Sequence, residues 1–166
     1  MKASVLGTIA MLLSAAVSPA QAADPDGYWS VATSEGEVRL GLVFPEFSVN
    51  EFAGLMFACH PGKPEVTILV DMPTTPPAGS ATEIVLTLPG RAGRYRGIVE
   101  VMQTDDRVMA RAATTFQDPL FEDLEKATSL SMTIAGKKND LPLRDVNPMV
   151  RRFLSACRAA TRPRAQ

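Results

Sequence analysis

The feature that most constrains the fold of this chain is a series of short segments in which apolar and polar residues alternate. The pattern is clearest in residues 38–44 and 65–71, where every second side chain is apolar. Successive side chains of a strand point to opposite faces, so each such segment predicts a strand with one buried face. Further β-prone segments, separated by turn-forming residues, span residues 28–33, 54–60, 83–88, 94–102, 107–115, 128–135 and 141–144.

The order of these segments predicts a mainly β fold. No long helical pattern separates one strand from the next, which favours antiparallel pairing. We therefore expect an antiparallel β-sandwich or a strongly curved sheet of about seven to nine strands. The alternative is an α+β layer in which one sheet packs on the last helix.

Two helices are predicted near the C-terminus. Asp118-Pro119 is a helix-start signal, since Asp caps free N–H groups and Pro fits the first helical position. A short helix is expected near residues 119–127. Asn147-Pro148 repeats the signal, and the apolar residues that follow lie on one helical face, which predicts a C-terminal helix over 148–160.

The two cysteines of the chain, Cys59 and Cys157, are expected to form a disulfide bond. Cys59 shares a strand face with Leu55 and Phe57, and Cys157 lies on the apolar face of the last helix. Both therefore face the predicted core. The alternative is a pair of buried free thiols.

The N-terminal segment, residues 1–22, predicts a secretory signal peptide. Lys2 is followed by an apolar run, and Ala20-Gln21-Ala22 is a small-x-small cleavage site. Cleavage between Ala22 and Ala23 would leave a single β-rich domain over 23–160 and a flexible tail at 161–166. The expected location is the periplasm or the exterior, where a disulfide is stable, with no transmembrane segment after signal cleavage.

Charge argues against nucleic acid as a partner. The chain has 17 basic and 18 acidic residues, a net charge of −1, whereas nucleic-acid binding needs a strongly basic face. The last helix nevertheless carries a possible basic patch, formed by Arg151, Arg152 and Arg158. Its expected partners are an envelope protein or an anionic surface, and the alternative is a solvated helix face.

Catalytic groups are sparse. His60 is the only histidine, lies at a proline turn, and is expected to be an exposed residue at a strand end. The paired acids Asp105-Asp106 and Glu122-Asp123 fall in a turn and a helix start, where carboxylates serve capping and solvation. We therefore predict no catalytic, cofactor-binding or metal-binding residues, and the alternative is a carboxylate pair that faces one cleft.

The best candidate for an interaction surface is the proline-rich loop between residues 72 and 81. It contains Met72, Pro73, Pro76 and Pro77. A loop stiffened by proline loses little entropy on binding, and long ordered loops often carry recognition.

Several motifs resemble small exported proteins of unknown function from Gram-negative, especially alphaproteobacterial, genomes. More distantly, the chain resembles the type VI secretion-associated periplasmic family, which pairs a strand cysteine with a late one. The resemblance implies an exported fold with such a pair and carries over no catalytic residue. The motifs are Trp29, residues 38–44, Phe57-Ala58-Cys59, Tyr95-Arg96-Gly97, Leu141-Pro142-Leu143 and Phe153-Leu154-Ser155-Ala156-Cys157.

Three functions follow as hypotheses. The first is a non-catalytic binding or accessory protein of the periplasm, which the scarcity of catalytic groups favours. The second is a structural or secretion-associated factor of the envelope, favoured by the basic C-terminus. The third is a hydrolase that uses His60 or a carboxylate pair.

Overall fold

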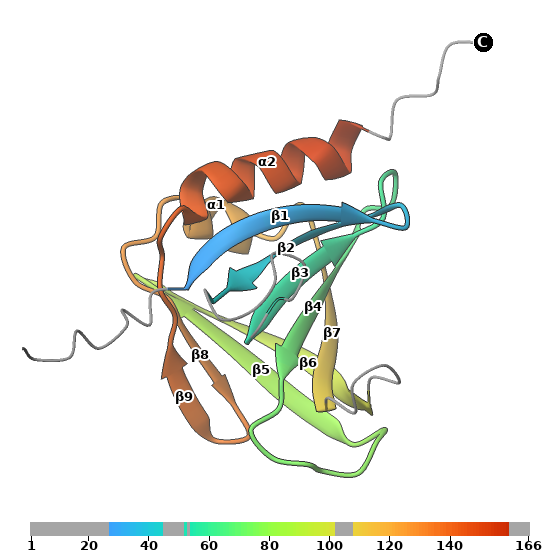
Figure 1. Ribbon diagram of the computed structural model, residues 1–166. Coiled ribbons are helices and arrows are strands. Elements are labelled where there is room, and N and C mark those ends of the chain that lie inside the picture. Colours follow the sequence, from blue (N-terminus) through green and yellow to red (C-terminus); the bar gives the residue numbers. More distant parts are fainter. Residues whose placement is uncertain (1–26, 45–51, 53, 102–107, 160–166) are drawn as a thin grey trace, which may run out of the picture.

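The computed structural model describes residues 27–44, 52, 54–101 and 108–159. Within these residues, nine strands form one antiparallel sheet, and two helices lie across one end of it (Figure 1). The strands are β1 (Tyr28–Ser34), β2 (Glu37–Val43), β3 (Leu55–Cys59), β4 (Glu65–Asp71), β5 (Ala81–Leu88), β6 (Arg91–Val101), β7 (Val108–Thr115), β8 (Ser131–Ile134) and β9 (Lys137–Asp140). The helices are α1 (Leu120–Glu125) and α2 (Val146–Ala159).

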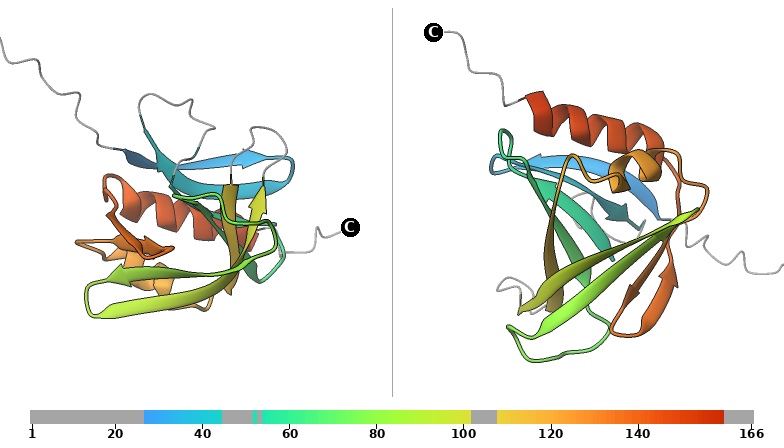
Figure 2. Two further views of the ribbon diagram at one scale, coloured as in Figure 1. Left: turned by 90° about the horizontal axis from the view of Figure 1, so that it is seen from below. Right: turned by 180° about the vertical axis from the view of Figure 1, so that it is seen from behind.

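The sheet follows the order β1-β2-β3-β4-β7-β6-β5-β8-β9. It curls into a half-barrel rather than splitting into two layers (Figure 2). Of the two predicted architectures, the curved sheet is therefore confirmed. Strands β1 to β4 lie side by side in chain order, but β5 does not follow β4 in the sheet. Instead β4 pairs with β7, and β5 pairs with β6 and β8.

The two ends of the curled sheet are joined by the segment that follows β9. The backbone N–H of Trp29 donates to the carbonyl oxygen of Arg144 at 3.0 Å. The indole Nε1–H of Trp29 donates to the carbonyl oxygen of Pro142 at 2.8 Å. We call the region around this segment, residues 141–144, the seam.

The core fills the concave side of the sheet. Alternate residues of β4, namely Val66, Ile68 and Val70, are fully buried, as their spacing predicts. An aromatic row crosses the core with ring centroids 5.4–6.3 Å apart, a spacing typical of favourable aromatic pairs. The row consists of Trp29, Phe57, Phe121 and Phe153.

Helix α2 closes this end of the core and is bonded covalently to the sheet. Cys59 at the end of β3 and Cys157 in α2 form the predicted disulfide, with α-carbons 6.1 Å apart. The bond joins residues 98 positions apart in the chain. In the chain-entropy model a loop of this length is worth at most about 4–5 kcal/mol.

One predicted strand is absent from the structure, and the C-terminal helix begins two residues before its expected start. The segment 141–144 is not a strand; the last strand is β9, residues 137–140, which the sequence pattern indicated as a loop. All four of its side chains are exposed, so no apolar alternation marks it. Helix α2 begins at Val146, ahead of the expected Asn147-Pro148 cap, after Asp145 with a φ of 61°.

Candidate functional site

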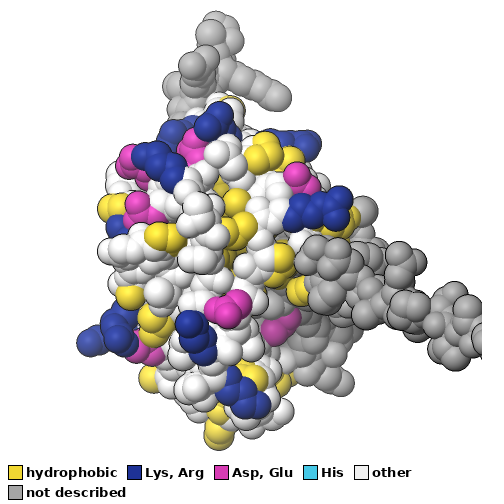
Figure 3. Space-filling model, turned by 90° about the vertical axis from the view of Figure 1, so that its left-hand side faces the viewer, with side chains coloured by type: hydrophobic (Ala, Val, Ile, Leu, Met, Phe, Trp, Pro, Cys, Tyr) yellow, Lys and Arg dark blue, Asp and Glu magenta, His cyan; other side chains and the backbone are white. Residues whose placement is uncertain are grey.

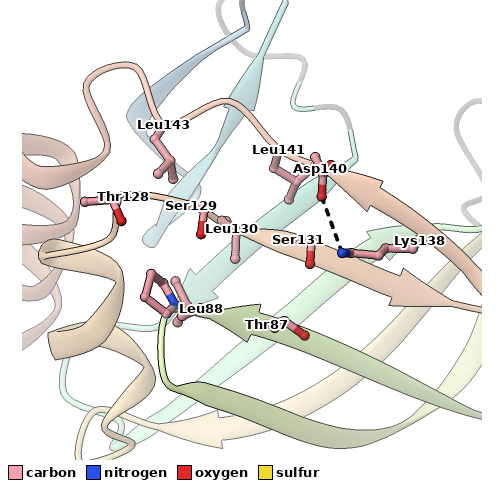
Figure 4. A pocket seen from close by; sticks show the side chains of 11 residues that line it. Thr87, Leu88, Thr128, Ser129, Leu130, Ser131, Lys138, Asp140, Leu141 and Leu143 are labelled. Carbon is pink, nitrogen blue, oxygen red and sulfur yellow. Dashed lines mark ion pairs between the residues drawn. The ribbon is translucent and has the colours of Figure 1, made fainter.

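Two hollows open beside the seam, and Asp140 and Leu141 line both of them. The first has a volume of about 560 Å³ and lies between the end of β5, the strand pair β8–β9 and the coil that enters β8 (Figure 4). Leucine and proline side chains form its apolar part, and serine and threonine hydroxyls its polar part. Its lining is Thr87, Leu88, Pro89, Thr128, Ser129, Leu130, Ser131, Lys138, Asp140, Leu141 and Leu143.

The second hollow, of about 630 Å³, lies on the other side of Leu141 and is mainly apolar. It is placed between the end of β2 and the strands β8 and β9. Both hollows are open to solvent, and their volumes fall within the ~300–1,000 Å³ of typical small-molecule sites, as does the hollow of about 610 Å³ beside α2. The lining is Leu42, Phe44, Gly54, Met132, Asn139, Asp140, Leu141 and Pro142.

The first hollow is lined by two charged side chains, Lys138 and Asp140, which lie at its rim. Lys138 Nζ is 3.9 Å from Asp140 Oδ1, and both side chains are mostly exposed. An exposed pair at this distance contributes little to stability. The face of the molecule on this side shows apolar atoms in its central hollow, with separate basic and acidic groups around them (Figure 3).

Local sequence explains how the seam is built. Ala135 and Gly136 both have positive φ, 47° and 75°. Two such residues form the tight turn of a two-residue hairpin, which here joins β8 to β9. This hairpin pairs Ser131 with Asp140 and places them together at the first hollow. Leu141 then donates its N–H to the carbonyl oxygen of Leu130 at 2.9 Å, which holds the seam against β8.

A second polar cluster lies where the β5–β6 turn meets the start of α1. The carboxylate of Asp118 accepts hydrogen bonds from the Leu120 amide (2.9 Å), the Thr114 hydroxyl (2.7 Å) and the Tyr95 hydroxyl (3.1 Å). Arg91 adds a charged contact at 2.9 Å. Asp118 therefore accepts a helix N–H as predicted, while Pro119 is the N-cap residue and not the first helical residue.

The titration of this cluster reflects its structural role. Burial by itself would raise the pKa of Asp118, but the hydrogen bonds and the charge of Arg91 together lower it. Burial, and then the negative charge of Asp118, raises the pKa of Tyr95 well above its ordinary value. Because the carboxylate already accepts four donors, it caps a helix and orients a turn rather than facing a substrate.

The proline-rich loop is ordered at its ends and exposed in its middle. Met72 N–H donates to the Val108 carbonyl at 2.9 Å, and Gly79 N–H to the Val99 carbonyl at 2.8 Å. The loop thus crosses the ends of β7 and β6 on its way to β5. Pro73 and Pro77 are exposed, while Met72 and Pro76 are half-buried.

The three residues of the possible basic patch, Arg151, Arg152 and Arg158, are all exposed on α2. Arg151 Nε lies 2.5 Å from Glu125 Oε1, so this arginine joins α2 to α1. Arg151 and Arg158 are two turns apart and line the same shallow hollow, whereas Arg152 points in another direction around the helix. Arg158 is exposed and also makes a contact within the protein.

His60 has the exposed position that the sequence predicts. It follows β3, and its Nε2 is 3.9 Å from Glu37 Oε1, with a side chain that is 67% exposed. Within the ranges that the structure describes, no group of three or more His, Cys, Asp or Glu side chains is placed to hold a metal ion. Asp105-Asp106, the predicted signal peptide at 1–22 and the predicted tail at 161–166 lie outside those ranges.

Sequence reasoning missed the seam as a site. Its hydroxyl groups, Thr87, Ser129 and Ser131, come from segments that only the strand order brings together. Gly136 is a local signal for the β8–β9 hairpin, because a Gly in a two-residue turn indicates strands on both sides, but it does not indicate the seam.

Comparison of the chain with family models, with characterised proteins and with solved structures found no match. In the described part of the chain, neither helix has the length and apolar character needed to cross a membrane.

Proposed function

We propose that this chain is a non-catalytic binding protein that works outside the cytoplasm and holds its ligand at the seam. The observation that carries the proposal is the pair of hollows that share Asp140 and Leu141. An apolar floor with a few hydroxyl groups is the usual composition of a small-molecule site. The disulfide supports the location, since such bonds persist in oxidising compartments.

The lining favours an amphipathic ligand. An apolar part would contact Leu88, Leu130 and Leu141, while the hydroxyls of Ser129 and Thr128 would meet a polar end. Rigid walls favour binding because little conformational entropy is lost when the ligand enters. The disulfide and the Trp29 hydrogen bonds supply that rigidity.

Trp29 makes the proposal directly testable. It is the only tryptophan, and its Nε1–H bonds to Pro142, within the segment that lines both hollows. Titration of the mature chain with decanoate, a medium-length amphipath, should shift Trp29 emission and the methyl resonances of Leu141 and Leu143. The variant Ser129→Phe fills the first hollow and should weaken the response at least tenfold.

Thr115→Phe is the matched control, because it adds the same ring at an exposed position of β7, away from the seam. Equal responses from the two variants would remove the seam as the binding site.

The exposed part of the proline-rich loop, residues 73–78, is tested separately by a Gly/Ser replacement that keeps the hydrogen-bonded ends. If the wild type and this replacement recover envelope proteins equally, the loop is not the interaction surface.

A further inference from the structure

The two edges of the curled sheet differ in what they offer to another strand. β9 is four residues long and carries Lys137, Lys138 and Asp140, and short charged edges discourage pairing. β1 is seven residues long and contains neither a charged residue nor a proline. β1 is therefore the edge suited to accept another strand.

The direction of the β1 backbone groups follows from its hairpin with β2. The turn residues Glu35 and Gly36 have φ values of 52° and 78°, and Ser34 pairs with Glu37. In a two-residue hairpin this flanking pair exchanges its backbone hydrogen bonds, and every second residue before it also bonds to the partner strand. Trp29, Val31 and Thr33 therefore direct their N–H and C=O groups away from β2.

The direction of these backbone groups is confirmed at one end of β1. The N–H of Trp29 does point away from β2, since it donates to Arg144. Further along β1, no backbone hydrogen bond from the described residues reaches the edge-facing groups of Val31 and Thr33. Thr33 is exposed and Val31 half-buried. Helix α2 contacts both β1 and β2, and Trp29 of β1 and Val150 and Phe153 of α2 belong to the same core.

We propose that this edge pairs with β1 of a second copy of the chain, in antiparallel orientation. Val31 of each copy faces Thr33 of the other, and these two pairs exchange four backbone hydrogen bonds. Ala32 faces its own counterpart at the two-fold axis, where the strands approach most closely and a small side chain fits. The opposed side chains are β-branched or small and neutral, so no like charges meet.

As the partner of β1, we favour β1 of a second copy over β9 of a second copy or a charged peptide. Two neutral strands pair without repulsion between like charges. Because α2 contacts both β1 and β2, the two α2 helices would lie about 10 Å apart across the axis, the distance of packed helices. Four strand hydrogen bonds and one helix contact make a small interface. Such interfaces give reversible dimers that form at high concentration.

The test is sedimentation of the mature chain from about 10 µM to about 1 mM, where weak dimers form, together with amide hydrogen exchange. We expect dimers at the upper end, with the amides of Val31 and Thr33 becoming protected as concentration rises. The Trp29 amide should be protected throughout. Thr33→Pro removes two of the four donors at an edge position that tolerates proline, and should raise the dissociation constant at least tenfold.

Thr33→Val is the matched control, since it keeps the N–H and the β-branched shape, and it should dimerise as the wild type does. Ala32→Glu is a second disrupting variant: Arg39 lies opposite within the same copy, but two carboxylates meet across the axis. Unchanged Trp29 emission confirms that each variant folds. A monomer at every concentration, or a dimer insensitive to both Thr33→Pro and Ala32→Glu, overturns the proposal.

Discussion

Asp118 connects three parts of the chain through one side chain: β7 through Thr114, β6 through Tyr95 and Arg91, and α1 through the Leu120 amide. A carboxylate is needed because hydrogen bonds to an ionised acceptor are about twice as strong as neutral ones. The contribution of this residue should therefore depend on its charge.

We predict that Asp118→Asn lowers the free energy of unfolding by about 1–3 kcal/mol at pH 7. The pKa of Asp118 in the folded protein lies below its ordinary value of 3.8. A lowered folded pKa means that the stabilisation is complete above the unfolded pKa and is lost as pH falls through the folded pKa. Urea unfolding at pH 7, 5 and 3 should show the gap between wild type and variant narrowing only below about pH 4. A gap that is the same at all three pH values would contradict this role of the charge.

Gly93 is required beneath the ring of Tyr95. A β-carbon at this position would lie 2.7 Å from the Tyr95 hydroxyl oxygen and 2.9 Å from a ring carbon. We predict that Gly93→Ala costs about 1–3 kcal/mol, as overpacked sites do, because Tyr95 must leave Asp118. Chemical unfolding in a Tyr95→Leu background provides the control. There the same substitution should cost much less, and an unchanged cost would place the clash elsewhere.

At the scale of elements, the disulfide determines how firmly α2 is held on the sheet. We predict that Cys59→Ala/Cys157→Ala lowers the unfolding free energy by about 3–5 kcal/mol, because the cross-link no longer restricts the unfolded chain and α2 can also leave the sheet locally. Hydrogen exchange in the folded double variant should increase first at the amides of Val150 and Phe153 in α2. If β4 and α2 lose protection equally, the disulfide stabilises the whole fold and not the helix position.

The β8–β9 turn has a residue that its backbone disfavours. Ala135 adopts a φ of 47°, a left-handed conformation that costs an ordinary residue about 1–2 kcal/mol and that Asn tolerates. We predict that Ala135→Asn raises the thermal midpoint, with a gain of about 0.5–1 kcal/mol. Glu35→Asn, at the matching position of the β1–β2 turn with φ 52°, should give a similar gain. A loss of stability in both would show that the turns relax away from this geometry.

The sequence predicts the elements well where burial decides them and poorly where pairing alone does. Val66, Ile68 and Val70 alternate because one face of β4 is buried, so the strand is evident from the sequence. β9 is held only by backbone pairing to β8, and its polar residues carry no periodic signal. The seam could not be predicted, because it depends on the pairing of β5 with β8, which brings Thr87 beside Ser131.

At the scale of the whole molecule, Trp29 links the first and last parts of the sheet. Its ring stacks near Phe57 in the core, and its Nε1–H reaches Pro142 across 113 positions of the chain. An open nine-stranded sheet has two free ends, and the seam is where hydrogen bonds join them. The rigidity of the hollows should therefore depend on this one side chain.

We predict that Trp29→Phe loosens the seam while leaving the centre of the sheet intact. The phenylalanine keeps an aromatic ring in the core but leaves the Pro142 carbonyl without its donor, at a cost of about 1–3 kcal/mol. Amide exchange should accelerate at Leu141 and Asn139, next to the seam, and remain slow at Phe57 and Ile68 in β3 and β4. Local opening of this kind has a lower free energy than global unfolding, so the two sets of amides separate clearly. Phe57→Leu, which disturbs the same aromatic row without touching the seam, is the control. Equal acceleration at all four amides in Trp29→Phe would mean that the sheet opens as one cooperative unit, with no independent seam.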